Sequence, residues 1–135
     1  MKQSIAGLLA TLGILAATSA QAIPAVTTIF FDNNTELALD AKIAGKPGKS
    51  IPAHITNYGV PYIAVYVTCQ YTGKTKACPI EFFDQRNQAL VATVIINADE
   101  ISVSTPPVLH GDYNNKYTVT GWETTPATHI RVNTK

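Results

Sequence analysis

Short runs of apolar and β-branched residues alternate with turn-forming residues throughout the chain after residue 22. Gly, Pro, Asn or Asp interrupts these runs about every 8 to 12 residues, which is the spacing of an antiparallel sandwich or barrel. In segment 36–44, Leu37, Leu39, Ala41 and Ile43 alternate with polar residues, as expected of a half-buried strand. The pattern predicts an all-β fold, namely a small antiparallel, immunoglobulin-like β-sandwich of about 7–9 strands.

The same pattern places the strands along the chain. They are expected at 27–32, 36–44, 50–56, 62–71, 76–84, 88–97, 101–104, 117–122 and 128–133. Pro52 makes 50–56 an edge strand, because proline cannot donate to a ladder of hydrogen bonds. Residues 108–116 are expected to form a polar loop.

The only two cysteines, Cys69 and Cys78, predict one disulfide across a hairpin. If they face each other, Val67 pairs with Ile80 and Val65 with Phe82, so one face of the hairpin is entirely apolar. A second hairpin that pairs Phe82 with Leu90, Ile80 with Ala92 and Cys78 with Val94 keeps the same face apolar. Segment 62–97 is therefore predicted to be a three-stranded meander, with a second layer of strands over its core face.

The first 22 residues have the composition of a secretory signal peptide. Lys2 precedes an apolar run of about 13 residues, and small residues end in Ala20-Gln21-Ala22. The run is shorter than the roughly 20 residues of a membrane-spanning helix, so cleavage after Ala22 and no membrane anchor are predicted. The mature chain, residues 23–135, is expected to be one domain that is exported to the periplasm or outside the cell. A short leader with a single lysine favours a bacterial source.

Charge and composition narrow the choice of partner. Removing Lys2 leaves 9 basic residues (10 less one) against 9 acidic ones, with no basic cluster. Binding to nucleic acid is not expected, because neutralising several phosphates requires a localised positive patch. No motif calls for a cofactor.

Histidines supply the one hypothesis that involves a metal or acid–base chemistry. His110 and Asp112 lie two positions apart in a loop, and His129 lies near the C-terminus. These residues are weak metal-ligand candidates and would be the centre of a small secreted hydrolase or metal-binding protein, although their spacing matches no established site. The serines after residue 22, namely Ser50, Ser102 and Ser104, lie in no nucleophile motif. Whether the chain is an enzyme stays open, with the absent motifs favouring a non-enzyme.

Aromatic residues carry the leading functional hypothesis. On a strand over 62–71, Tyr62 and Tyr66 would point away from the core, and tyrosine combines a large contact area with a polar tip. Tyr113, Tyr117 and Trp122 form a second aromatic group. The chain is therefore interpreted as an exported binding module that recognises a protein or a glycan through these residues. A secreted inhibitor or host-directed factor is a further alternative.

Overall fold

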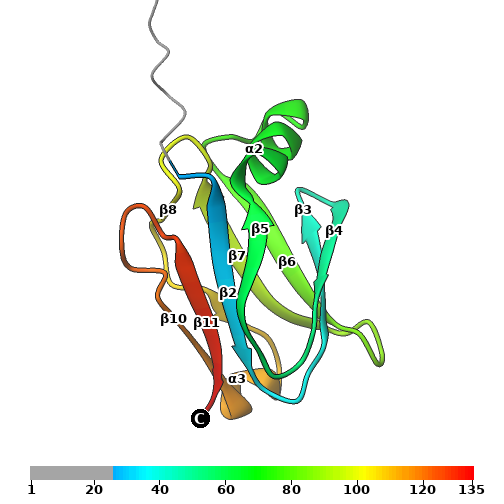
Figure 1. Cartoon of the computed structure of the whole chain (residues 1–135). Coiled ribbons are helices and arrows are strands. Elements are labelled where there is room, and N and C mark those ends of the chain that lie inside the picture. The colour runs from blue at the N-terminus through cyan, green and yellow to red at the C-terminus, as the bar shows by residue number, and fades with distance from the viewer. Residues whose placement is uncertain (1–25) are drawn as a thin grey trace, which may run out of the picture.

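The computed structural model describes residues 26–135, of which strands make up 49%. Ten strands, two short helices and a disulfide between Cys69 and Cys78 lie in this range. The strands form two sheets in which most neighbours are antiparallel (Figure 1). The prediction of a mostly β protein with one disulfide is therefore confirmed. The expected signal peptide, residues 1–22, lies outside the described residues.

One sheet has four strands and the other has six. In spatial order, the four-stranded sheet contains β10 (Tyr117–Thr120), β11 (His129–Thr134), β2 (Thr28–Asn34) and β5 (Ile55–Pro61). Only β2 and β11 run parallel in it. The six-stranded sheet contains β4 (Lys46–Ile51), β3 (Leu39–Ile43), β6 (Cys78–Asp84), β7 (Leu90–Asn97) and β8 (Ser102–Val103), with β9 (Val108–Leu109) also paired to β7.

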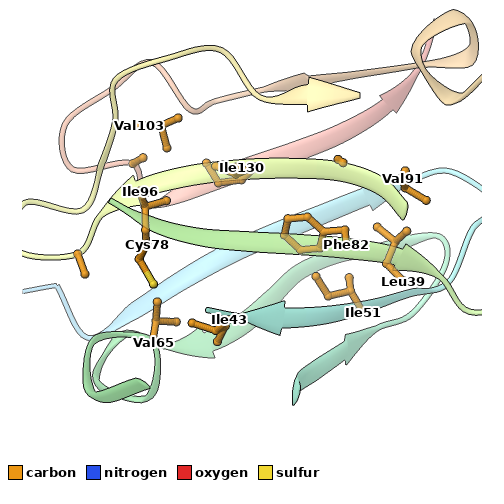
Figure 2. Packing of buried hydrophobic residues seen from close by; sticks show 14 of the residues in the cluster. Leu39, Ile43, Ile51, Val65, Cys78, Phe82, Val91, Ile96, Val103 and Ile130 are labelled. Carbon is orange, nitrogen blue, oxygen red and sulfur yellow. The ribbon is translucent and has the colours of Figure 1, made fainter. Parts of the chain in front are cut away.

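Apolar side chains from both sheets meet in one main core cluster (Figure 2). Ile130 of β11 belongs to it together with Leu39 of β3 and Phe82 of β6. The Phe82 ring lies edge-on to that of Phe31 of β2, with 6.1 Å between the centroids. Removal of this apolar surface from water is the main force that holds the two sheets together.

The largest departure from the sequence prediction is segment 62–71, which is helix α2 (Tyr62–Tyr71) and not a strand. Its buried residues Tyr62, Val65 and Cys69, with Tyr66 partly buried, follow the spacing i, i+3, i+4 and i+7 of one helix face. The run is so uniformly apolar that a strand face can be read from it equally well. The helix ends where Gly73 adopts a φ of +74°, a left-handed conformation that glycine adopts without strain.

The neighbours of β6 also differ from the prediction. Phe82 faces Ala92, Ile80 faces Val94 and Cys78 faces Ile96. This register is shifted by two residues from the predicted one and keeps the same side chains on the core face, since side chains alternate along a strand. The other neighbour of β6 is β3, which takes the place expected for segment 62–71.

Two further expectations change in detail. The strand expected at 50–56 is divided between β4 and β5, which belong to different sheets, and Pro52 lies in the connection. The expected loop 108–116 contains β9 and helix α3 (Tyr113–Lys116). The remaining expected strands match observed strands, although their bounds differ by up to a few residues.

Candidate functional site: the exposed face of helix α2

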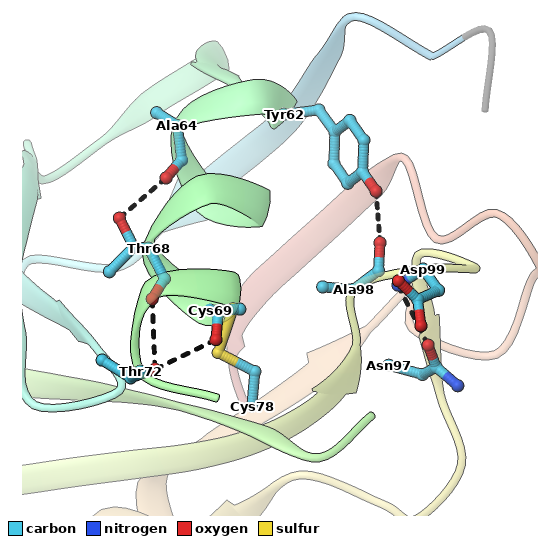
Figure 3. The surroundings of a disulfide bond; sticks show 9 residues. All are labelled: Tyr62, Ala64, Thr68, Cys69, Thr72, Cys78, Asn97, Ala98 and Asp99. Atoms are coloured by element: carbon cyan, nitrogen blue, oxygen red, sulfur yellow. Dashed lines mark hydrogen bonds between the residues drawn. A yellow bond between two sulfur atoms is a disulfide. The ribbon is translucent and has the colours of Figure 1, made fainter. Parts of the chain in front are cut away.

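Helix α2 lies at one end of the two sheets and is held by a buried contact near each of its ends (Figure 1). Near its C-terminus, the disulfide joins Cys69 to Cys78 at the start of β6, with 5.7 Å between the two Cα atoms (Figure 3). In the first turn, the hydroxyl of Tyr62 donates a hydrogen bond to the backbone carbonyl of Ala98. Burial raises the pKa of Tyr62 to about 12, so this hydroxyl keeps its proton at neutral pH. Because both ends are fixed, the orientation of the outer face is fixed as well.

The outer face of α2 carries three apolar side chains in one row. Ile63, Val67 and Tyr71 are 52%, 51% and 83% exposed, and they are spaced four residues apart. Residues at i and i+4 are neighbours on a helix surface, so the three form a continuous strip, which we call the α2 stripe. Residues 62–71 include no charged residue. A helix that is apolar on both its inner and its outer face is unusual unless something covers the outer face.

Polar and basic groups border the α2 stripe. The hydroxyl of Thr68 donates to the carbonyl of Ala64 within the helix, 2.8 Å away, which satisfies its hydrogen-bonding requirement locally (Figure 3). Lys74 and Lys76 follow the helix directly, and Lys76 forms an ion pair with Asp99 at 3.0 Å. Lys74 is exposed and, within residues 26–135, makes no ion pair. The loop that follows α2 thus carries one exposed lysine, Lys74, that no carboxylate of the described residues neutralises.

The structure contradicts the predicted row of exposed tyrosines. Tyr62 is only 2% exposed and faces the interior, so it cannot contact a partner. Tyr66 is half-buried, with its ring centroid 5.9 Å from that of Tyr62. The prediction placed these residues on the outer face of a strand, whereas the helical spacing turns them inward and turns Ile63 and Val67 outward. Sequence reasoning missed the α2 stripe for this reason, although Pro61 and Gly73 flank the helix as start and stop signals.

The second predicted aromatic group does contain two residues that lie together, but they serve packing. Tyr113 and Tyr117 stack with their centroids 6.3 Å apart, at the α3 end of the molecule and far from α2 (Figure 1). The Tyr113 hydroxyl donates to Asp84, and the Tyr117 hydroxyl donates to Glu36 at 3.0 Å. Burial is the main cause of the raised pKa of both tyrosines. Tyr117 is buried, and Trp122, the third member, packs half-buried against the main core.

The candidate metal ligands have separate partners. His110 Nε2 lies 2.8 Å from the Thr93 hydroxyl, and Asp112 pairs with Lys116 at 3.2 Å. His129 Nε2 lies 2.9 Å from the Asp32 carboxylate, though without the alignment of a hydrogen bond. Among residues 26–135, no three His, Cys, Asp or Glu side chains are grouped so that they could hold a metal ion. The structure therefore does not assemble His110, Asp112 and His129 into one site.

The buried carboxylate of Asp32 has a structural role in the four-stranded sheet. Its carboxylate accepts the backbone N–H of Asn57 at 2.7 Å, and Arg131 Nε lies 3.3 Å from it. Asn57 has a φ of 54° and lies opposite an irregularity in the pairing of β2 with β5. The hydrogen bond from Asn57, and then the neighbouring His129, hold the pKa of Asp32 below its usual value. The carboxylate thus satisfies a backbone group that the bulge leaves without a partner in the sheet.

Comparison with protein families, curated proteins and solved structures finds no match for the chain. Within residues 26–135, neither helix has the length and apolar character needed to cross a membrane. The site must therefore be interpreted from its own geometry.

Proposed function

We propose that the chain is an exported binding module and that it recognises a protein partner through the α2 stripe. The observation that carries this proposal is the exposure of Ile63, Val67 and Tyr71 on a helix whose two ends are fixed. A fixed apolar surface loses little conformational entropy when it binds, which favours recognition. An apolar surface with a charged rim is also the usual anatomy of a protein interface.

The disulfide supports export. Both cysteines of the described range are paired and fully buried, and such a bond persists in oxidising compartments such as the periplasm or the extracellular space. This agrees with the signal peptide proposed for residues 1–22, with release of one mature domain of residues 23–135.

We also propose that the two sheets are the layers of a small β-sandwich of immunoglobulin-like type. Side chains of both sheets contribute to one core, as the two layers of a sandwich would. The first and last described strands, β2 and β11, pair in parallel in the middle of the four-stranded sheet.

The chemistry of the α2 stripe favours a protein over the other classes of partner. A glycan site needs several aromatic faces with hydrogen-bonding groups beside them, whereas Tyr71 is the one aromatic residue of the α2 stripe and Ile63 and Val67 are aliphatic. Helices that bind membranes carry Lys or Arg on their own polar face, and α2 has neither. An apolar protein surface with an acidic border fits best.

Site-specific photo-cross-linking in the cells that naturally produce the chain tests this proposal. The cross-linking amino acid is placed at Val67, in the middle of the α2 stripe, and at Asn114 in α3 as an exposed control at the far end. We expect a discrete covalent adduct of defined protein mass from position 67 and none from position 114. Ile63→Lys in the same chain should abolish the adduct, because it places a charge next to the cross-linker.

Every other outcome contradicts the proposal. An adduct with lipid would assign the α2 stripe to a membrane surface, and an adduct of twice the mass of the chain would assign it to self-association. Equal labelling from positions 67 and 114, or no adduct at position 67, would show that the α2 stripe recognises no partner. Circular dichroism of each variant checks that the fold is retained.

A further inference from the structure

A cluster of polar and charged side chains lies on the outer side of the four-stranded sheet, where β2 and β11 run side by side (Figure 1). Ile130 of β11 belongs to the core, so its neighbours His129 and Arg131 point to the opposite side of the strand. In the parallel pairing of the two strands, His129 lies beside Phe30 and Arg131 beside Asp32. The cluster shares no residue with the α2 stripe.

One carboxylate oxygen of Asp32 faces both His129 and Arg131. His129 Nε2 lies 2.9 Å and Arg131 Nε lies 3.3 Å from the same atom, Oδ2. The other oxygen, Oδ1, accepts the backbone N–H of Asn57. This hydrogen bond is the main cause that holds the pKa of Asp32 below its usual value, so the carboxylate stays ionised in neutral and mildly acidic solution. His129 and Arg131 therefore compete for a single anionic oxygen.

Arg131 also fixes the protonation state of the imidazole. One terminal guanidinium nitrogen of Arg131 is hydrogen-bonded to His129 Nδ1, with 3.4 Å between the two atoms. Arginine can only donate, so Nδ1 is the acceptor and carries no proton. The ring proton is then on Nε2, which is buried and faces Asp32 without the alignment of a hydrogen bond. This arrangement therefore requires a neutral histidine.

The other elements around the imidazole contribute neutral groups and one more carboxylate. The Phe30 ring of β2 lies beside it, with 6.2 Å between the centroids, and β5 contributes the uncharged Asn57. The loop between β10 and β11 contributes Glu123, whose carboxylate accepts the N–H of Gly121 at 3.1 Å. A Cβ atom at Gly121 would lie 3.4 Å from the Arg131 guanidinium, so the arginine extends along this loop.

From this geometry we propose that protonation of His129 releases Arg131, so that this face of the sheet gains a free guanidinium group in mildly acidic solution. A proton on Nδ1 removes the acceptor that Arg131 uses and sets two cations against each other. The imidazolium keeps Oδ2 of Asp32, because its Nε2 is the closer nitrogen and is buried. Arg131 is the group that moves, because its side chain is 43% exposed and water can solvate its charge. The charge of a histidine ordinarily changes between about pH 8 and pH 5, which sets the range of the release.

NMR relaxation of the full mature chain between pH 8 and pH 5 tests this proposal. The order parameter of the Arg131 Cδ methylene reports how rigidly the side chain is held and does not depend on exchange with water. We expect it to fall by about a third or more, with the same midpoint as the protonation of the His129 ring. Arg86, the other arginine of the chain, is the internal control, because it stays bound to Asp84, whose pKa is about 2. Ring nitrogen shifts at pH 8 should place the proton of His129 on Nε2.

The variant His129→Gln separates the proton from the rest of the cluster. Glutamine also offers a donor and an acceptor but gains no proton in this range, so Arg131 should stay equally ordered at pH 8 and pH 5. Circular dichroism checks that the variant folds. If it does not fold, the comparison of Arg131 with Arg86 in the wild-type chain still decides.

Four results would overturn the proposal. An equally ordered Arg131 at both pH values in the wild-type chain would show a static group of three charges. Loss of order at both arginines would show a general loosening of the protein. A pH step retained in His129→Gln would show that another group triggers the release, and a ring proton on Nδ1 at pH 8 would contradict the starting arrangement.

Discussion

Asp84 is a fully buried carboxylate with four hydrogen-bond donors around it. Arg86 supplies its backbone N–H and two guanidinium nitrogens at 2.7–3.1 Å, and Tyr113 supplies its hydroxyl at 2.9 Å. These contacts, with that from the Arg86 side chain largest, lower the pKa of Asp84 from 3.8 to about 2. The carboxylate therefore ties the β6–β7 turn to α3.

The lowered pKa gives stability a defined pH dependence. A carboxyl group with a depressed pKa in the folded state stabilises the protein above its unfolded pKa, and this contribution is lost as pH falls. For Asp84, the loss should run from about pH 4 to about pH 2 and amount to about 2 kcal/mol. Urea denaturation across this range is the measurement.

Substitution of Asp84 checks that the acid sensitivity comes from this residue. Asp84→Asn should cost about 1–3 kcal/mol at pH 6, because Arg86 and Tyr113 lose a charged acceptor. The variant should also lose less stability than the wild type between pH 4 and pH 2. Asp112→Asn is the matched control: contacts with Asn115 and Lys116 also lower the pKa of Asp112, but they are exposed to solvent, so this variant should keep most of the wild-type acid dependence. An unchanged acid dependence in Asp84→Asn would contradict the assignment.

For single residues, the sequence indicates the chemistry of a side chain better than its surroundings in the fold. It brought Tyr113 and Tyr117 together correctly but could not show that Asp84 and Glu36 receive their hydroxyls, because those carboxylates come from distant segments. The Asp84-Gln85-Arg86 sequence does carry a local signal, since an aspartate that accepts the N–H two residues later marks a turn.

Among the elements, α2 depends on a long-range bond more than on its own sequence. A ten-residue helix is too short to be stable alone in water. The disulfide closes a loop across nine positions, and it should contribute about 2.5 kcal/mol by restricting the unfolded chain. It also holds the last turn of the helix against β6.

Reduction should therefore act mainly on α2. The variant Cys69→Ala/Cys78→Ala is expected to lose about 2–4 kcal/mol of unfolding free energy. In hydrogen exchange, the amides of residues 66–72 should lose protection more than those of β6 and β7, because many strand contacts outside the loop remain. Equal loss of protection in the helix and the two strands would show that the disulfide supports the whole fold and not this element.

The contrast between α2 and β3 explains which elements the sequence predicts. In β3, buried Leu39 and Ile43 alternate with the polar residues Asp40 and Lys42. The two-residue period of a strand therefore fits this segment, and the 3.6-residue period of a helix does not. Segment 62–71 has no charged residue to mark its outer side, and both periods fit. Cys69 does face Cys78, but a disulfide fixes only one pair of positions and not the geometry of the segments that carry them.

For the molecule as a whole, turn spacing and apolar alternation predicted a mostly β protein with two layers of apolar surface to cover. The pairing order of the sheets could not be predicted, because β2 and β11 are neighbours across almost the whole described chain. Helix α2, which carries the α2 stripe, and helix α3, which Asp84 holds through Tyr113, lie at opposite ends of the sheets (Figure 1). Local sequence patterns do not predict the α2 stripe or the contacts of Asp84.

Segment 62–71 is a helix that turns Val65 inward and presents Ile63 and Val67 to solvent. NMR of the mature chain with a soluble paramagnetic agent tests it directly, because relaxation of a methyl group increases with its exposure. Helical Cα shifts over 62–71 are expected, with strong relaxation at the Ile63 and Val67 methyls and weak relaxation at those of Val65. Strand-type shifts, or Ile63 and Val67 methyls as protected as those of Val65, would show that this segment is not such a helix.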